Sequence, residues 1–263
     1  MNTEEMLEVR DGIKPPLYEG KAKQLYSTDN PDELLMVFKD DITAGNGAKK
    51  DTMSEKGKLN CTISKKIYEY LHDNKVDTHY ISSPKVNEQI VKKVKIIPVE
   101  VVIRNISAGS ICRRYGIEKG ITFKTPLLEL FYKDDDLDDP LCNEDVVCEL
   151  NWATRHQLRM MKEKAHIVHK LMTDYWAKYN LQLIDAKYEF GTTTARLGAP
   201  LSGDIVLADE ITCDSQRIWT KDGKSLDKDV FRQGDNMQDV SDVYNYIHNL
   251  IGADDIYEWG CPR

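Results

Sequence analysis

Three charged side chains alternate with apolar ones in the segment 183–191, and their types could serve phosphate and metal chemistry. Successive side chains of a β-strand point to opposite faces, so Asp185, Lys187 and Glu189 would share one face, about 6–7 Å apart. The opposite face would pack inward through Ile184, Ala186, Tyr188 and Phe190. A lysine can contact a phosphoryl oxygen, and carboxylates can hold Mg²⁺. A solvated strand face gives the same pattern, and this segment alone favours that simpler interpretation.

A second acidic segment follows soon after and changes that balance. Asp209 and Glu210 come directly after the apolar run 205–208. Glycine and proline before this run indicate a loop, so 183–190 and 205–212 could form a hairpin that brings Asp209 near Glu189. Two carboxylates in a partly dry site repel each other unless a cation lies between them. The pattern predicts a Mg²⁺ site at Glu189 and Asp209, with a strand end bearing surface acids as the alternative.

Size and composition limit the classes of function. The chain has 263 residues, 41% hydrophobic and 30% charged, which is typical of a globular protein with one large domain or two lobes. Its formal net charge of −8 argues against broad binding of nucleic acid or an anionic membrane. It has no apolar run of about 18 residues and no basic, apolar leader. The six cysteines form no C-x-x-C pair. We therefore expect a cytoplasmic protein with reduced thiols.

Hydrophobic periodicity predicts a mixture of strands and helices. Helical spacing occurs at 58–71, 154–179 and 238–251, and Thr154 is a suitable N-cap for the second helix. Strands are expected at 17–18, 24–27, 34–38 and 96–103. Because these elements do not alternate strictly, we expect an α+β fold. An N-terminal lobe would span 1–92, and a C-terminal lobe would span 93–263.

Other segments offer cations that could meet an anionic ligand. Gly20, Lys21 and Lys23 lie at a turn between strands, where glycine permits close approach of a ligand and lysines supply charge. A buried-looking strand leads to Arg104, and a turn of small residues then leads to Ser110 at the start of a helix. A helix N-terminus suits phosphate. The alternative for the turn at 20–23 is a solvated hairpin that carries lysines. The alternative for the second segment is a serine helix cap beside a surface arginine.

Two further stretches have less decisive patterns. The glycine- and asparagine-containing loop 42–50 could be a lid, an anion-binding nest or an ordinary connection. The acidic run 134–139 is typical of a solvated loop. The histidines show no H-x-x-x-H spacing and no triad-like setting, so the sequence gives no support for a Ser-His-Asp hydrolase.

Several of these stretches together resemble the SAICAR synthetase family of de novo purine synthesis. The two most specific matches are IIPVEVVIRNISAGS at 96–110 and LIDAKYEFG at 183–191. The other matches are YEGKAKQLYST at 18–28, ITAGNGAKK at 42–50, LADEIT at 207–212 and DKDVFRQG at 227–234. The resemblance therefore extends in order over nearly the whole chain.

The resemblance implies an ATP-dependent ligase that uses Mg²⁺. Its substrates would be L-aspartate and CAIR, 5-amino-1-(5-phosphoribosyl)imidazole-4-carboxylate, and its products SAICAR, ADP and phosphate, with an acyl phosphate as intermediate. It also implies an N-terminal lobe like the small lobe of protein kinases, an ATP-grasp-like C-terminal lobe, and nucleotide between them. The chain would form a homo-oligomer, without nucleic-acid or membrane partners. A small-molecule kinase and a nucleotide-sensing module are the alternatives.

The resemblance also implies roles for individual residues. Those near ATP would be Lys21, Ala22 and Lys23 along its phosphates, Lys92 in the 91–94 hinge beside adenine, and Lys187. Glu189 and Asp209 would hold Mg²⁺. The ribotide would meet Arg104, Ser110, Arg217, Lys228 and Arg232. Its polar groups, or a second metal ion, would meet Asp139, Asp185 and Asp214. Catalytic roles would fall to Lys187, Asp185 and Lys21. Many bacterial members carry aspartate where this chain has Asn46, so a charged role at that position is not expected.

Overall fold

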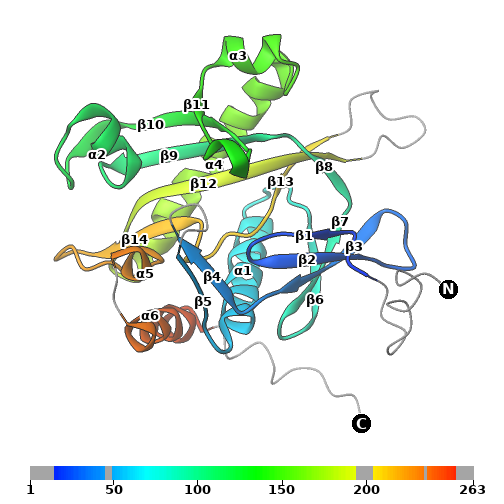
Figure 1. The fold of residues 1–263 in the computed structure, drawn as a ribbon, viewed down its shortest axis with the longest axis horizontal. Coiled ribbons are helices and arrows are strands. Elements are labelled where there is room, and N and C mark those ends of the chain that lie inside the picture. The colour runs from blue at the N-terminus through cyan, green and yellow to red at the C-terminus, as the bar shows by residue number, and fades with distance from the viewer. Residues whose placement is uncertain (1–14, 45–48, 194–203, 234–235, 253–263) are drawn as a thin grey trace.

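The structure is a computed structural model that describes residues 15–44, 49–193, 204–233 and 236–252. Near the N-terminus, an antiparallel sheet has the strand order β1-β2-β3-β7-β6 (Figure 1). Its strands are β1 (Tyr18–Glu19), β2 (Lys23–Ser27), β3 (Glu33–Phe38), β6 (Tyr80–Lys85) and β7 (Glu88–Lys92). The short pair β4 (Asp41–Ala44) and β5 (Lys49–Thr52) stands apart from it.

The second sheet contains seven strands and carries most of the candidate site. They are β8 (Val94–Ile96), β9 (Val99–Ile106), β10 (Thr122–Tyr132), β11 (Leu141–Cys142), β12 (Leu181–Thr193), β13 (Ile205–Ala208) and β14 (Gln216–Thr220). The long strand β12 is its centre. The first part of β12 pairs with β9 and β14, and its last part pairs with β8 and β13, always antiparallel.

Helices pack against both sheets. They are α1 (Lys56–Asp73), α2 (Ser110–Tyr115), α3 (Glu144–Glu149), α4 (Arg155–Lys178), α5 (Asp229–Gln233) and α6 (Met237–Leu250). Helix α4 covers strands β12, β9 and β13, whereas α1 packs on the N-terminal sheet and against α6 (Figure 1). In the described part of the chain, no helix is long and apolar enough to cross a membrane.

The three helices expected from periodicity are confirmed. Thr154 caps α4 as expected, because its hydroxyl accepts from the backbone N–H of Gln157 and the Gln157 side chain accepts from the Thr154 N–H. This reciprocal capping box satisfies two donors at the start of the helix. The apolar stripe of α4 is core packing: Leu158, Met161 and Met172 are fully buried.

The predicted hairpin between β12 and β13 is confirmed, and its register matters for the site. Glu189 pairs with Ala208, so Asp209 follows directly after the last strand residue opposite Glu189. The inward face of β12 differs from the expectation at one position. Ile184 packs in a separate cluster, away from Ala186 and Tyr188. The pairing of β12 with β14 shifts between Leu183 and Asp185. Such an irregularity moves the side chains that precede it to the opposite face of the sheet, and Ile184 is one of them.

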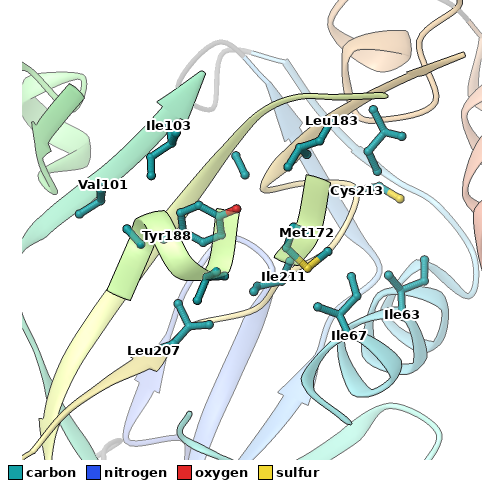
Figure 2. Packing of buried hydrophobic residues seen from close by; sticks show 14 of the residues in the cluster. Ile63, Ile67, Val101, Ile103, Met172, Leu183, Tyr188, Leu207, Ile211 and Cys213 are labelled. Atoms are coloured by element: carbon teal, nitrogen blue, oxygen red, sulfur yellow. The ribbon is translucent and has the colours of Figure 1, made fainter. Parts of the chain in front are cut away.

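The strand expected at 96–103 is two strands, because Pro98 separates β8 from β9. Proline lacks the N–H that a continuous ladder needs. The main core is nevertheless continuous across the proposed boundary at residue 92. It joins Ile63 and Ile67 of α1 to Tyr188 of β12 and Leu207 of β13 (Figure 2).

Candidate active site

The charged face of β12 meets the charged side chains of its neighbours. Lys187 donates from Nζ to Glu100 Oε1 on β9 and to Glu189 Oε1, both at 2.7 Å. Lys133, just after β10, donates to the same Glu189 oxygen at 2.7 Å. Two lysines and two glutamates therefore form one cluster, defined here as the β12 cluster (Lys187, Glu189, Glu100 and Lys133).

Electrostatics keep the central pair of this cluster ionised. Burial opposes the charge on Glu189, but Lys187, Lys133 and Lys23 outweigh it and hold the pKa of Glu189 below its usual range. Burial likewise opposes the charge on Lys187, yet Glu189 and Glu100 raise the pKa of that lysine. Burial raises the pKa of Glu100. A buried charge is tolerated only when it is paired. Glu189 and Lys187 pair with each other, so both remain charged in the cluster.

Asp209 lies beside the β12 cluster. The ammonium group of Lys23, on β2, contacts the carboxylates of both Asp209 and Glu210. Asp209 and Glu189 line the same cavity of about 300 Å³. Its apolar wall comes from the N-terminal sheet and from β8, through Leu25, Leu34, Met36, Val91, Val94 and Ile96. Lys23 and Lys92 also line the cavity. Two residues expected beside ATP therefore meet the two carboxylates expected to hold Mg²⁺.

Glu189 and Asp209 are the two carboxylates whose fit to a divalent cation can be examined in this cavity. In the described residues, no group of three or more His, Cys, Asp or Glu side chains is arranged to hold a metal. Mg²⁺ in nucleotide sites is usually held by one or two carboxylates together with phosphate oxygens and water. Glu189 and Asp209 both line this cavity, and two carboxylates are enough for that arrangement. The ammonium group of Lys23 neutralises Asp209 and Glu210 in this structure.

A second charged network begins four residues earlier on β12. Asp185 is 4% exposed and lies between two arginines. Arg104 donates from one Nη to Asp185 Oδ2 at 2.6 Å, and Arg217 donates to both Asp185 oxygens at 2.9 and 3.1 Å. Arg104 also donates to Glu129 at 2.7 Å, and Arg217 to Asp229 at 2.7 Å. We define Arg104, Asp185 and Arg217 as the arginine cradle.

The turn before α2 belongs to this cradle. Ser110 is the first residue of α2, and its hydroxyl lies 3.2 Å from an Nη of Arg104. The alternative of a serine cap beside a surface arginine is wrong. Gly109 is the N-cap, no side chain caps this end, and Arg104 is only 3% exposed. A Cβ at Gly109 would overlap the guanidinium of Arg217, which would have to shift, and φ is +66° there, where an L side chain is strained.

Two other expected site residues lie in a buried network beside α1 and α6. Asp214 accepts from Lys56 Nζ at 2.7 Å and from the Tyr244 hydroxyl. Lys228 lies 3.8 Å from the same carboxylate, and burial lowers its pKa. Arg232 pairs with Asp229 and so joins the arginine cradle from α5.

The remaining expected residues lie at the acidic turn and the lysine loop. Lys21 pairs with Asp135 at 2.7 Å, and Asp139 accepts from the backbone N–H of Asp134 at 3.0 Å. The carbonyl of Ala22 accepts from the Lys39 N–H at 2.8 Å. The run 134–139 contains a short 3₁₀ turn with exposed residues, as expected of a solvated loop. Position 46, residues 194–203 and residues 253–263 lie outside the described residues.

Sequence reasoning missed two members of the β12 cluster, Glu100 and Lys133. A signal for Glu100 was present, because it is an ionisable residue inside a run of β-branched residues that reads as a buried strand. Such a residue is almost never buried unless it is paired. Lys133 carried no comparable signal, since it follows its strand at an ordinary loop.

Comparison with known proteins shows the family. The sequence model described as SAICAR synthetase matches residues 16–249. The phosphoribosylaminoimidazole-succinocarboxamide synthase of Staphylococcus carnosus is 45% identical over 238 residues, which cover 90% of this chain and 98% of that protein. The enzyme of the same name from Finegoldia magna is 44% identical over 236 residues, which cover 89% of this chain and 98% of that protein.

Solved structures agree with the sequence comparison. The phosphoribosylaminoimidazole-succinocarboxamide synthase of Ehrlichia chaffeensis superposes with a TM-score of 0.85 at 38% identity, covering 91% of this chain and 99% of that one. A SAICAR synthetase in complex with ADP has a TM-score of 0.80 at 37% identity, covering 94% and 99%. The antiparallel α+β architecture is therefore that of these enzymes. By sequence and by fold, this chain belongs to the SAICAR synthetase family.

Proposed function

We propose that this chain is an ATP-dependent carbon–nitrogen ligase that joins the carboxylate of CAIR to the amine of L-aspartate. The products are SAICAR, ADP and phosphate. One observation carries the proposal: β12 presents Asp185 to an arginine cradle and, four residues later, presents Glu189 to the cavity that Asp209 lines. The names of the relatives, and the ADP bound to one of them, support the same activity.

The nucleotide is assigned to the cavity between the two sheets. Its apolar wall suits adenine, with Lys92 at the hinge, and its charged end suits the phosphates. Lys21, Ala22 and Lys23 follow the phosphate tail, and Lys187 reaches it from β12. The division at residue 92 is supported by the two sheets falling on either side of that residue. The likeness of the lobes to the small lobe of protein kinases and to ATP-grasp enzymes stays a prediction from the family resemblance.

The ribotide is assigned to the arginine cradle. Its phosphate carries negative charge that planar guanidinium groups bind well, and Ser110 adds a hydroxyl. Arg232 and Lys228 extend the positive charge toward α5. Asp139, Asp185 and Asp214 are the acidic residues that we also assign to binding of the ribotide. Asp185 orients both arginines of the cradle, because each of them donates to its carboxylate.

The chemistry requires neutralisation of charge more than covalent help from the protein. A carboxylate is a poor electrophile, so the CAIR carboxylate first takes the γ-phosphoryl group and becomes an acyl phosphate. The neutral amine of aspartate then attacks the carbonyl carbon, the carbon–oxygen bond to phosphate breaks, and the departing phosphate accepts the proton that the nitrogen loses. Mg²⁺ held by Glu189 and Asp209 would neutralise charge on the phosphates. Lys187 and Lys21 act on the transferring group by position and charge.

Omission of single cosubstrates tests the proposed reaction. In the presence of ATP and Mg²⁺, ADP and SAICAR are expected in equal amounts only when CAIR and L-aspartate are both present. A small-molecule kinase would consume ATP with CAIR at a rate that aspartate does not change. A nucleotide sensor would bind ATP and release no ADP. Either of these results would overturn the ligase assignment.

Replacement of Gly109 tests the ribotide assignment. Gly109→Ala is expected to raise the KM for CAIR at least about tenfold, because the new methyl group displaces Arg217 from Asp185. The KM for ATP should change little, since the nucleotide cavity lies at the other end of this β12 face. Gly116→Ala is the matched control. Gly116 also has positive φ, at +62°, but nothing lies within 4 Å of its Cβ position. If Gly109→Ala and Gly116→Ala changed the KM for CAIR equally, the assignment of the ribotide to the arginine cradle would be contradicted.

We also propose a cytoplasmic location and a homo-oligomeric state. The five cysteines in the described part of the chain are free thiols, which suits a reducing compartment. The oligomeric state stays a prediction from the family resemblance, and sedimentation equilibrium of the purified chain would measure it.

A further inference from the structure

The backbone carbonyl of Asp209 is held by two side chains from the N-terminal segment. The Tyr68 hydroxyl, on α1, donates to it. Nε2 of His79, just before β6, lies 2.8 Å from the same oxygen, and since a carbonyl can only accept, this nitrogen carries the proton. Tyr68 and His79 are 0% and 5% exposed. Neither residue has a role in the reaction proposed above.

Asp209 needs such support because its backbone is unusual. Its φ is +66°, in the left-handed region that L-residues other than Asn and Asp seldom adopt. A residue in this region keeps its conformation only when its surroundings determine it. Two donors on one carbonyl fix the peptide plane after Asp209, and with it the direction in which the carboxylate leaves the chain.

The two donors are themselves fixed by packing. The ring of Tyr68 stacks on that of Tyr80 with centroids 5.5 Å apart and planes 8° apart. The ring of His79 meets Tyr68 edge to face at 5.6 Å. Well-packed aromatic groups hold their polar atoms in place better than flexible side chains can.

Helix α1 holds the far end of the same loop. Lys56, in its first turn, donates to Asp214 at 2.7 Å, and Asn60, one turn later, lies 3.4 Å from that carboxylate. The loop from Asp209 to Asp214 is therefore tied to α1 at both ends. A displacement of α1 would be transmitted to the carboxylates.

We propose that Tyr68 and His79 are positioning residues that set the metal-binding geometry of Asp209 through its backbone carbonyl. The inference rests on the proposed function, because it gives Asp209 its role. Tyr68 does not line the nucleotide cavity, whereas His79 forms part of its lining. Their contribution is to hold the carboxylate of Asp209 in the cavity that Glu189 also lines.

Removal of one hydroxyl tests the proposal. Tyr68→Phe is expected to weaken the binding of Mn²⁺ to the enzyme–ADP complex about tenfold, measured by titration calorimetry without turnover, because one buried hydrogen bond is lost. The Mg²⁺ concentration for half-maximal activity should rise by a similar factor, with the KM for CAIR unchanged. Tyr70→Phe is the matched control. Tyr70 is on the same helix, and its hydroxyl also donates to a backbone carbonyl, that of Leu171 at 3.3 Å, outside the site. A folded Tyr68→Phe variant with the Mg²⁺ dependence of the Tyr70→Phe variant would overturn the proposal.

Substitution of His79 gives an independent test. His79→Gln keeps a donor at the position of Nε2 and should retain most of the Mg²⁺ affinity, whereas His79→Leu should lose it about tenfold. Equal Mg²⁺ dependence in the two variants would contradict a role for the donor.

A double-mutant cycle separates this inference from the proposed function. In an Asp209→Asn background, Tyr68→Phe should have no further effect on Mg²⁺ dependence, because it acts through Asp209. If Asp209→Asn alone leaves the Mg²⁺ dependence unchanged, the proposed metal site fails. If Asp209→Asn changes it and Tyr68→Phe does not, only the positioning role fails.

Discussion

Glu189→Gln is expected to lower the rate of SAICAR formation by about 100- to 1000-fold, because a neutral amide is a poor ligand for Mg²⁺ and cannot balance Lys187. Asp209→Asn should act in the same direction. The measurement is steady-state turnover over a range of Mg²⁺ concentrations, with folding checked by circular dichroism. The two effects should be far from additive, since both carboxylates would hold one cation in the proposed site.

Glu144→Gln is the matched control for this experiment. Glu144, on α3, pairs with Lys162, and its side chain is 46% exposed. It is not among the residues that line the cavity. Surface ion pairs contribute little to stability, so activity should stay near that of the unaltered chain. Turnover of the Glu189→Gln variant close to the control at saturating Mg²⁺ would count against a metal role for Glu189.

Arg217→Ala should raise the KM for CAIR by roughly 10- to 100-fold, the range for a lost charged hydrogen bond to phosphate. The KM for ATP should change much less, because Arg217 contacts Asp185 and Asp229, and neither lines the cavity. The fold should persist, since Arg104 still pairs with Asp185 and Arg232 with Asp229. Initial rates with each substrate varied in turn measure the two constants.

Arg155→Ala supplies the control for the arginine experiment. Arg155 pairs with Asp145 at 2.9 Å, and both side chains are largely exposed. This substitution should leave both KM values unchanged. If Arg217→Ala weakened ATP and CAIR equally, the separation of the cradle from the nucleotide cavity would be wrong.

The elements that carry the site could be predicted because their signals are local. Alternation of apolar and charged residues indicated β12, and the glycine and proline residues before 205 indicated the hairpin that places Asp209 beyond Glu189. The cap at Thr154 and the apolar stripe behind it indicated α4. Each of these depends on neighbours within a few residues, which the sequence displays directly.

The partners of the charged groups could not be predicted, because they depend on register between distant strands. Lys187 meets Glu100 only because β12 and β9 pair as they do, and no local pattern sets that offset. The contact from Tyr68 to Asp209 joins residues 141 positions apart. The reversal at Ile184 follows from an irregularity in pairing with β14, which its own segment does not indicate.

A crystal structure with a non-hydrolysable ATP analogue, CAIR and Mn²⁺ in place of Mg²⁺ would test the central claim most directly. Anomalous scattering locates the metal without ambiguity. The account predicts a Mn²⁺ ion bonded to carboxylate oxygens of Glu189 and Asp209 and to the nucleotide phosphates, with the ribotide phosphate at Arg104 and Arg217. A metal bound elsewhere, with both carboxylates still paired only to lysines, would contradict it.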